Sequence, residues 1–339
     1  MKKYNVAVVG ATGMVGRTFL RVLAERKFPI SKIKLLASRR SAGKKVDFNG
    51  KECLVEELTP SAFEGVDFAF FSAGSEISKT FAPEAVARGV QVIDNSNAFR
   101  MDPEVPLVVP EVNPEEALKN KGIIANPNCS TIQMVVVLNP LHQAAKLKRV
   151  VVSTYQAVSG AGKAAVDGLY REAARVLARE DAEPANLPHA GAKKYHQIAF
   201  NMVPQIDVFV EDGYTKEEMK MINESRKILN LPDLRITATT VRVPVEIGHS
   251  ESVNLEFEEP LPVEEAKEIL RRAPEIVVMD DPAELDYPMP FYMSGRDEVF
   301  VGRLRPDKSV ASGLNLWIVA DNIRKGAATN SIQIAELLL

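Results

Sequence analysis

Residues 4–16 read YNVAVVGATGMVG, and this stretch decides the fold of the N-terminal part of the chain. Its apolar run, residues 4–10, is typical of a strand buried inside a parallel sheet. Gly10, Gly13 and Gly16 then permit a tight turn that brings backbone N–H groups close to a pyrophosphate at the start of a helix. The spacing is Gly-x-x-Gly-x-x-Gly, not the commoner Gly-x-Gly-x-x-Gly. A plain turn between strand and helix is therefore the alternative to a dinucleotide site.

Apolar runs and helical patterns alternate through the rest of the first 100 residues. Helical spacing predicts helices over 14–26 and 83–88, and apolar runs predict strands over 33–37, 66–72 and 90–94. Strands that alternate with helices indicate a parallel sheet that is covered on both faces.

The second half of the chain has a different pattern. A strand-like run at 150–158 is followed by helical patterns at 163–179 and 215–229. Later strand-like runs suit a mixed or antiparallel sheet; they lie at 237–245, 252–257, 276–278, 299–304 and 314–319. The last segment, 322–339, is helical, and we expect it to pack back on the first domain.

A chain of 339 residues is long enough for about two domains of ~150 residues each. We therefore expect an α/β protein in which residues 1–128 plus 320–339 form a nucleotide-binding domain and residues 129–319 form a second, α+β domain. A hydrophobic content of 46% and a charged content of 26% are those of an ordinary soluble globular protein.

Composition also excludes several kinds of partner. The net charge is -3 and no basic stripe is present, which argues against a nucleic-acid partner. No apolar run approaches the ~20 residues that cross a bilayer, so we expect no membrane partner. The two cysteines cannot form a disulfide framework and indicate a reducing compartment. We expect a cytoplasmic protein without a metal site, in which Cys53 is structural.

The residues after the second predicted strand indicate which nucleotide is bound. NAD-binding proteins usually place Asp or Glu there to bind the ribose 2′-hydroxyl, whereas Arg accommodates a 2′-phosphate. Residues 38–41 read SRRS, with Lys44 and Lys45 beyond them and no acid. This pattern favours NADP; a solvated basic loop is the alternative.

A cysteine lies at the predicted start of a helix, where residues 126–131 read NPNCST. Proline followed by Asn, Ser and Thr is typical of a helix N-terminus. Unpaired backbone N–H groups and the positive end of the helix dipole favour the thiolate of Cys129. Because the thiolate is the nucleophilic form, the segment indicates covalent catalysis. A small buried apolar residue is the alternative reading of Cys129.

An activated cysteine beside a nucleotide turn suggests hydride transfer to a thioester, and this chemistry needs an acid or base. The chain has four histidines, His142, His189, His196 and His249. Their spacing from Cys129 does not by itself choose among them.

Four features together resemble bacterial aspartate-semialdehyde dehydrogenase. They are the glycine turn, the PNCST segment at 127–131, Arg242 seven residues before His249, and the closing ADNIRKGAA at 320–328. The resemblance covers essentially the whole chain in order, with no departure at a motif position. It implies an N-terminal Rossmann-type domain, a catalytic and dimerisation domain, and a C-terminal helix that returns to the first domain.

The resemblance implies NADPH-dependent reduction of L-aspartyl 4-phosphate to L-aspartate 4-semialdehyde with release of phosphate. This reaction belongs to the biosynthesis of lysine (through diaminopimelate), threonine, methionine and isoleucine. Cys129 would be the acyl-enzyme nucleophile, His249 the general acid/base, and Gln156 would position the substrate near the thiol. The family also implies self-association as a homodimer or homotetramer.

The resemblance further assigns the substrate groups. Arg242 would bind the α-carboxylate and Glu217 the ammonium, while Arg100 and Lys220 would hold the phosphate. A guanidinium binds a carboxylate bidentately, which suits Arg242. Glu217 and Lys220 lie three residues apart on a predicted helix and so share a face; a surface ion pair is the alternative. For Arg100 the alternative is a solvated loop charge.

The cofactor contacts that the resemblance implies come from three segments. The glycine turn and the residues after the second strand would hold the pyrophosphate and the adenosine phosphate, and two later segments would lie near the nicotinamide. The implied residues are Gly10, Thr12, Gly13, Met14, Val15, Ser38, Arg40, Ser41, Ser159, Gly160 and Asn322.

Three other functions compete with this reading. N-acetyl-γ-glutamyl-phosphate reductase has a Gly-Cys-Tyr type of environment around its thiol and no need for an acid such as Glu217. Glyceraldehyde-3-phosphate dehydrogenase pairs its cysteine with a histidine closer in sequence, and here only His142 lies near Cys129. A dinucleotide-binding sensor would lack the reactive cysteine or histidine, and both residues are present.

Overall fold

The computed structural model describes residues 2–339, which form two compact units. The first unit contains the chain up to Asn128 together with Gly326–Leu339, and the second contains Cys129–Lys325. Residues 320–325, which the sequence pattern grouped with the first domain, lie in the second unit because the last strand of its sheet runs to Ala320. No helix in residues 2–339 is long and apolar enough to cross a membrane.

The first unit contains a seven-stranded sheet with the strand order β3-β4-β2-β1-β5-β6-β7. Every neighbouring pair is parallel except β3 and β4, which form an antiparallel hairpin. The strands span Tyr4–Val9 (β1), Ile30–Ala37 (β2), Lys45–Phe48 (β3), Lys51–Glu57 (β4), Phe68–Phe71 (β5), Gln91–Asp94 (β6) and Ile123–Ala125 (β7).

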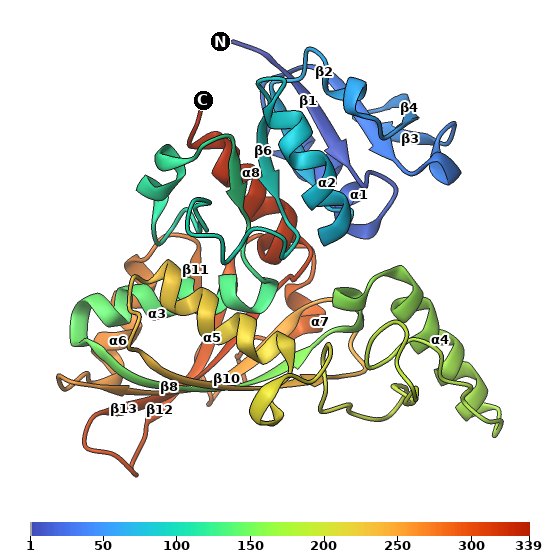
Figure 1. Cartoon of the computed structure of the whole chain (residues 1–339). Coiled ribbons are helices and arrows are strands. Elements are labelled where there is room, and N and C mark those ends of the chain that lie inside the picture. Colours follow the sequence, from blue (N-terminus) through green and yellow to red (C-terminus); the bar gives the residue numbers. More distant parts are fainter. Residues whose placement is uncertain (1) are drawn as a thin grey trace. The chain divides into compact units, whose positions relative to one another are not determined.

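Helices cover both faces of this sheet, as the alternating pattern predicted (Figure 1). Phe19 of α1 (Met14–Glu25) and Ile332 of α8 (Thr329–Glu336) belong to one apolar cluster with Val6 and Val8 of β1. Ala82 and Ala85 of α2 (Ser75–Val86) belong to the cluster on the other face. The C-terminal helix therefore packs in the first unit.

Two predictions for the first unit were wrong in detail. The helix predicted over 83–88 runs over Ser75–Val86, because Pro83 lies inside it and does not begin it. Proline suits a first helical turn, and this preference misplaced the start. The β3–β4 hairpin was missed, because its short polar strands lack the apolar run of a buried strand.

The second unit contains a six-stranded mixed sheet with the order β11-β12-β13-β10-β8-β9. Pairs β8–β9 and β11–β12 are parallel and the others antiparallel, which agrees with the predicted mixed sheet. The strands span Leu147–Gln156 (β8), Arg235–Arg242 (β9), His249–Phe257 (β10), Ile276–Val278 (β11), Val299–Pro306 (β12) and Gly313–Ala320 (β13).

Three helices of the second unit cover one face of its sheet (Figure 1). They are α3 (Cys129–Ala145), α5 (Lys216–Ile228) and α6 (Val263–Arg272), and the pattern gave no helix for α6. The other helices are α4 (Lys163–Leu177) and α7 (Pro290–Met293), and a π-helical turn, Arg324–Ala328, precedes α8. His249 follows β9 and is the first residue of β10.

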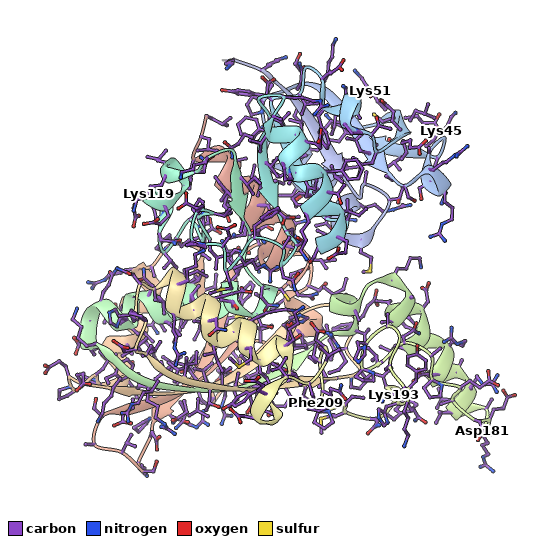
Figure 2. All side chains as sticks on the ribbon, viewed as in Figure 1. Lys45, Lys51, Lys119, Asp181, Lys193 and Phe209 are labelled. Carbon is purple, nitrogen blue, oxygen red and sulfur yellow. The ribbon has the colours of Figure 1, made fainter. Side chains whose placement is uncertain are left out.

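The surface of the second unit carries apolar side chains between α4 and α5. Phe200, Met202 and Phe209 are each more than half exposed, and Figure 2 labels Phe209 at this surface.

The surface of the first unit carries charged side chains. Lys45, for example, pairs with Glu52 across the β3–β4 hairpin at 2.9 Å.

Candidate active site

Cys129 is the first residue of α3, as the NPNCST segment predicted. The residues from Ser130 to Leu138 are all buried, so the first part of the helix is held in the core of the second unit. The cysteine itself is half-buried, and the first turn of α3 contains no acidic residue. The unpaired N–H groups of a helix start favour an anion, so this position suits a thiolate.

Gln156 is the last residue of β8 and contacts two other polar side chains. Its Nε2 donates to Ser130 Oγ at 2.7 Å and to Glu217 Oε1 at 3.3 Å. Ser130 is the neighbour of Cys129 in α3, so Gln156 lies close to the start of the helix that carries the thiol. Its side chain is only 1% exposed.

Glu217 and Lys220 lie on α5, which begins with a capping box. Thr215 accepts the Glu218 backbone N–H, and the Glu218 carboxylate accepts the Thr215 N–H at 2.7 Å. Lys220 Nζ donates to Glu217 Oε2 and to Asp207 Oδ2, both at 3.0 Å. Burial alone would lower the pKa of Lys220, but these two carboxylates outweigh it and raise the pKa above its ordinary value.

Glu217 and Lys220 therefore do not form a surface ion pair. Glu217 is 5% exposed and its two oxygens contact different side chains, Gln156 and Lys220. Asp207 is a contact that the sequence did not predict, because it lies in the irregular segment before α5 where no pattern marks its partner.

Arg242 is the last residue of β9 and lies opposite Gln156 in the parallel pairing of β8 with β9. Its Nη1 donates to the Ala157 carbonyl at 2.7 Å, whereas its buried Nε has no hydrogen-bond partner in residues 2–339. Burial lowers the pKa of Arg242, and the nearby Glu217 and Cys129 groups oppose that change. A buried cation with an unmet donor suits an anionic ligand.

His249 is fully buried beside Arg242. Its Nδ1 accepts the backbone N–H of Ala157 at 3.0 Å, so the neutral ring carries its proton on Nε2. In the described part of the chain Nε2 has no hydrogen-bond partner. Burial, and then the charge of Arg242, lower the pKa of His249 to about 3, with Glu217 opposing. The ring is therefore neutral at physiological pH.

The turn Val158–Ala161 approaches Arg242 and His249 closely. A Cβ built on Gly160 would lie 2.9 Å from Arg242 Nη1 and 3.3 Å from His249 Nε2. Glycine is therefore the residue that lets this turn lie against both side chains. Asn322 holds the same region, since its Oδ1 accepts the Gly248 N–H at 2.9 Å and its Nδ2 donates to Ser159 Oγ at 3.0 Å.

The other three histidines do not lie at this site. His142 is in the last turn of α3, where its Nδ1 accepts the Leu147 N–H at 3.0 Å and burial lowers its pKa. His189 and His196 lie in the irregular segment between α4 and α5. Of the four histidines, His249 is the one that lies beside Arg242, so it stays the candidate acid/base.

In the first unit, the predicted nucleotide residues gather at the carboxyl ends of β1 and β2. Gly10 has a φ of +85°, and a Cβ on it would lie 2.8 Å from the Ser72 carbonyl oxygen. A Cβ on Gly16 would lie 2.2 Å from the Gly10 oxygen, so this turn requires glycine. Residues 38–41 follow the neighbouring strand β2, with 39–41 in a 3₁₀ turn. Crevices at this edge of a parallel sheet bind nucleotides.

Arg100 belongs to the first unit and follows β6. Its guanidinium donates to the carbonyl of Asn126 at 2.9 Å and to that of Asn95 at 3.1 Å, and it is 7% exposed. Asn126 also receives a hydrogen bond from Asn330 of α8 at 2.7 Å. Arg100 is therefore an ordered, buried residue and not a solvated loop charge.

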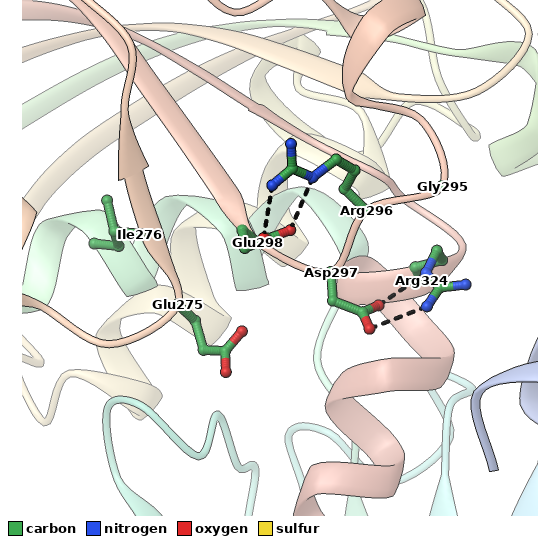
Figure 3. A pocket seen from close by; sticks show the side chains of 7 residues that line it. All are labelled: Glu275, Ile276, Gly295, Arg296, Asp297, Glu298 and Arg324. Carbon is green, nitrogen blue, oxygen red and sulfur yellow. Dashed lines mark hydrogen bonds and ion pairs between the residues drawn. The ribbon is translucent and has the colours of Figure 1, made fainter. Parts of the chain in front are cut away.

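A pocket of about 700 Å³ in the second unit contains none of the predicted site residues (Figure 3). Its lining charges are paired: Arg324 binds Asp297 through two hydrogen bonds of 2.9 and 3.0 Å, and Arg296 binds Glu298 at 2.8 Å. This pocket is therefore not the candidate active site. We place the candidate active site at Cys129, Gln156, Arg242 and His249.

Known proteins resemble this chain over nearly its whole length. Residues 5–120 match the semialdehyde dehydrogenase NAD-binding domain and residues 138–325 its dimerisation domain. Aspartate-semialdehyde dehydrogenase of Aquifex aeolicus is 57% identical over 99% of this chain and 98% of its own length. The Bacillus subtilis enzyme is 54% identical over 98% of this chain and 97% of its own length.

Solved structures are similar over the whole chain. Aspartate semialdehyde dehydrogenase II of Vibrio cholerae, complexed with ASA, has a TM-score of 0.93, with 48% identity and coverage of 100% of this chain and 98% of that one. The Candida albicans enzyme solved with NADP has a TM-score of 0.74, with 27% identity and coverage of 99% and 98%. With this fold and these full-length relatives, the chain belongs to the aspartate-semialdehyde dehydrogenase family.

Proposed function

We propose that this enzyme reduces L-aspartyl 4-phosphate with NADPH to L-aspartate 4-semialdehyde and phosphate, through a thioester on Cys129. In this role it would serve the biosynthesis of lysine (through diaminopimelate), threonine, methionine and isoleucine. The observation that carries the proposal is the group of Cys129, His249, Arg242 and Glu217 in one buried region of the second unit.

The charges of this group match an amino-acid substrate. Arg242 would bind the α-carboxylate, since its buried Nε donor has no partner in residues 2–339. Glu217 would bind the ammonium, and Gln156, which already contacts Glu217, would position the acyl group near the thiol. An acylated amine carries no positive charge for Glu217 to bind, so this arrangement argues against an N-acetylated substrate.

Arg100 and Lys220 are the proposed ligands of the substrate phosphate. The carboxylates of Glu217 and Asp207 raise the pKa of Lys220, so this residue is an ammonium at neutral pH. Arg100 is fixed by two backbone carbonyls, which leaves its orientation independent of the substrate. A fixed cation loses little conformational entropy when it binds an anion.

The nucleotide residues fit NADP. The turn with Gly10, Thr12, Gly13, Met14 and Val15 leads into α1, whose backbone N–H groups suit a pyrophosphate. Ser38, Arg40 and Ser41 follow β2 without a carboxylate among them, which favours a 2′-phosphate. Ser159, Gly160 and Asn322 are proposed to lie near the nicotinamide.

The proposed chemistry begins with the thiolate. Cys129 attacks the acyl carbon, a C–S bond forms, and the C–O bond to phosphate breaks as phosphate leaves. When bound, NADPH supplies the hydride that reduces the thioester. His249 donates its Nε2 proton to the thiohemiacetal oxyanion and takes the proton back as the C–S bond breaks, which frees the aldehyde and the thiolate. Backbone N–H groups at the start of α3 would stabilise the oxyanion as well.

The reverse reaction tests this function. We expect the purified protein to reduce NADP in the presence of L-aspartate 4-semialdehyde only when phosphate is added, and arsenate should replace phosphate. A sensor that only binds nucleotide would show no turnover. A lower KM for NADP than for NAD is expected from residues 38–41, and a marked preference for NADH would overturn the cofactor assignment.

A further inference from the structure

Gln133 and Glu251 are buried polar residues that the proposed chemistry does not use. Gln133 on α3 is 1% exposed and Glu251 on β10 is 0% exposed. Both lie where α3 packs on β10, a position that apolar side chains would fill without the desolvation cost of an amide and a carboxyl group. Their polarity therefore calls for an explanation other than stability.

Gln133 joins the helix of the thiol to the strand of the imidazole. It lies four residues after Cys129, so the two side chains share one face of α3, about one turn apart. Its Nε2 donates to the backbone carbonyl of His249 at 3.4 Å. A change in the rotation of α3 about its axis would break this contact and move Cys129 together with it.

Glu251 supports the same contact from the strand. It lies two residues after His249, so both side chains project from one face of β10. Burial raises the pKa of Glu251 well above its ordinary value, and the nearby Gln133 amide opposes only part of that rise. Neither carboxyl oxygen of Glu251 has a hydrogen-bond partner in residues 2–339. Burial therefore favours the neutral carboxyl group, which can both donate to and accept from an amide.

A second link ties the start of α3 to the neighbouring strand β8. Ser130, next to Cys129, accepts the Gln156 Nε2–H at 2.7 Å, and β8 pairs directly with β10. The first two turns of α3 thus contact the strand that ends at Gln156 and the strand that begins at His249. Two links at different positions fix the rotation of a helix, whereas one link permits pivoting.

We propose that Gln133 and Glu251 are positioning residues: the Gln133 contact with the His249 carbonyl, beside the buried Glu251 carboxyl group, fixes the start of α3 on β10 and so sets the separation between the Cys129 thiol and the His249 imidazole. The inference rests on the proposed function of Cys129 and His249. Such polar pairs specify one geometry among packings that apolar contacts alone would leave close in energy.

The first test replaces the amide with an apolar side chain of similar length, Gln133→Met, in a Cys53→Ser background. Because misplacement by about 1 Å can cost ~100-fold in rate, we expect kcat to fall at least about tenfold while the KM for aspartate semialdehyde stays near wild type. Alkylation of Cys129 by iodoacetamide should slow as well, because the thiol moves relative to Arg242.

A matched control separates positioning from stability. Val137 is buried one turn further along the same face of α3. Val137→Ala should lower the melting temperature and leave kcat at 25 °C unchanged. A wild-type kcat in Gln133→Met, or an equal fall in kcat in Val137→Ala, would overturn the proposal.

The second test uses Glu251. Glu251→Gln keeps a neutral group that can bond Gln133, so kcat should be retained, whereas Glu251→Met should reproduce the loss of Gln133→Met. Loss of kcat in Glu251→Gln at an unchanged melting temperature would refute the neutral pair. Failure of the proposed function is distinguishable, because the wild-type protein would then show no phosphate-dependent turnover, while the alkylation rates still report the position of the thiol.

Discussion

The sulfur of Cys129 is activated by two features that lie far apart in the sequence. The start of α3 supplies the positive end of a helix dipole, and Arg242, at the end of β9, supplies a buried positive charge. Both favour the thiolate over the thiol. Cys53 has neither feature, since it lies half-buried in β4 of the other unit. The two cysteines should therefore differ in reactivity.

Substitution of the thiol tests this difference. Cys129→Ala should abolish turnover because the covalent intermediate cannot form, and it should leave NADPH binding nearly intact because Cys129 is not among the proposed nucleotide residues. Steady-state assays and fluorescence titration with NADPH measure the two effects. Cys53→Ala is the control and should retain full activity. Turnover by the Cys129→Ala variant would exclude the covalent mechanism.

The buried imidazole makes a pH-dependent contribution to stability. The pKa of His249 is about 3 in the folded protein and about 6.5 in the unfolded chain, so between these values the unfolded state binds more protons. The contribution of this group to the free energy of unfolding is therefore complete above about pH 6.5. As the pH decreases below that value, the contribution decreases by up to about 1.4 kcal/mol per pH unit. Arg242 and Glu217 are the charged groups that face it.

The His249→Gln variant measures this contribution. It lacks the titrating group, so from pH 7 to pH 4.5 the free energy of unfolding should fall more steeply in the wild-type protein than in the variant. Urea unfolding at several pH values gives both curves. A difference between the two proteins that stays constant over this range would contradict the lowered pKa of His249.

At the scale of a single element, α5 illustrates how a local sequence signal positions the site. The capping box of Thr215 and Glu218 fixes where the helix begins, and Glu218 Oε1 also accepts the Thr240 N–H at 2.9 Å. The helix start is thereby tied to β9, the strand that ends at Arg242. Glu217 and Lys220 follow within the first turns, so the cap sets their position.

Removal of the cap should lower both the stability of the protein and its affinity for the substrate. Thr215→Ala should lower the free energy of unfolding by about 1 kcal/mol, the usual value of an N-cap hydroxyl, and should raise the KM for the substrate because Glu217 loses its fixed position. Denaturant titration and steady-state kinetics measure the two effects. Thr239→Ala, exposed on β9, should change neither. Equal behaviour of the two variants would dismiss the role of the cap.

At the scale of the whole molecule, the second sheet has one face without a covering helix over most of its width. Helices α3, α5 and α6 lie on the other face (Figure 1), and α7 covers only one end, where Met293 packs on Phe300 and Val319. Half-buried residues face outward from the central strands, including Val151, Ser153, Tyr155, Ser252, Asn254, Asn315 and Trp317. The chain also matches a dimerisation domain over 138–325.

We therefore expect a homodimer or homotetramer that buries this face. Sedimentation equilibrium should give a multiple of the 37.3 kDa chain mass. Val151→Glu places a carboxylate in the middle of the face, where desolvation would cost several kcal/mol, and should favour the monomer. Lys45→Glu, on the β3–β4 hairpin, is the control. A monomeric wild-type protein would refute the expectation.

Sequence patterns predicted much of the fold wherever one periodicity dominates. The buried strand β1, the glycine turn and the helix that starts at Cys129 follow from runs of apolar residues, glycine spacing and capping residues. The β3–β4 hairpin and the start of α2 escaped prediction, because polar edge strands and an interior proline conflict with the usual patterns. The roles of the site residues came from resemblance and stay predictions.

The sequence by itself determined the two-unit α/β architecture, the glycine turn and the position of Cys129 at the start of a helix, because these depend on patterns among residues close in the chain. Only the tertiary structure decided that His249 lies beside Arg242, that Asp207 shares Lys220 with Glu217, and that Gln133 contacts the His249 carbonyl. The Asp207–Lys220 and Gln133–His249 contacts join residues 13 and 116 positions apart, and no local pattern encodes them. Their geometry depends on how β8, β9 and β10 align beneath α3 and α5.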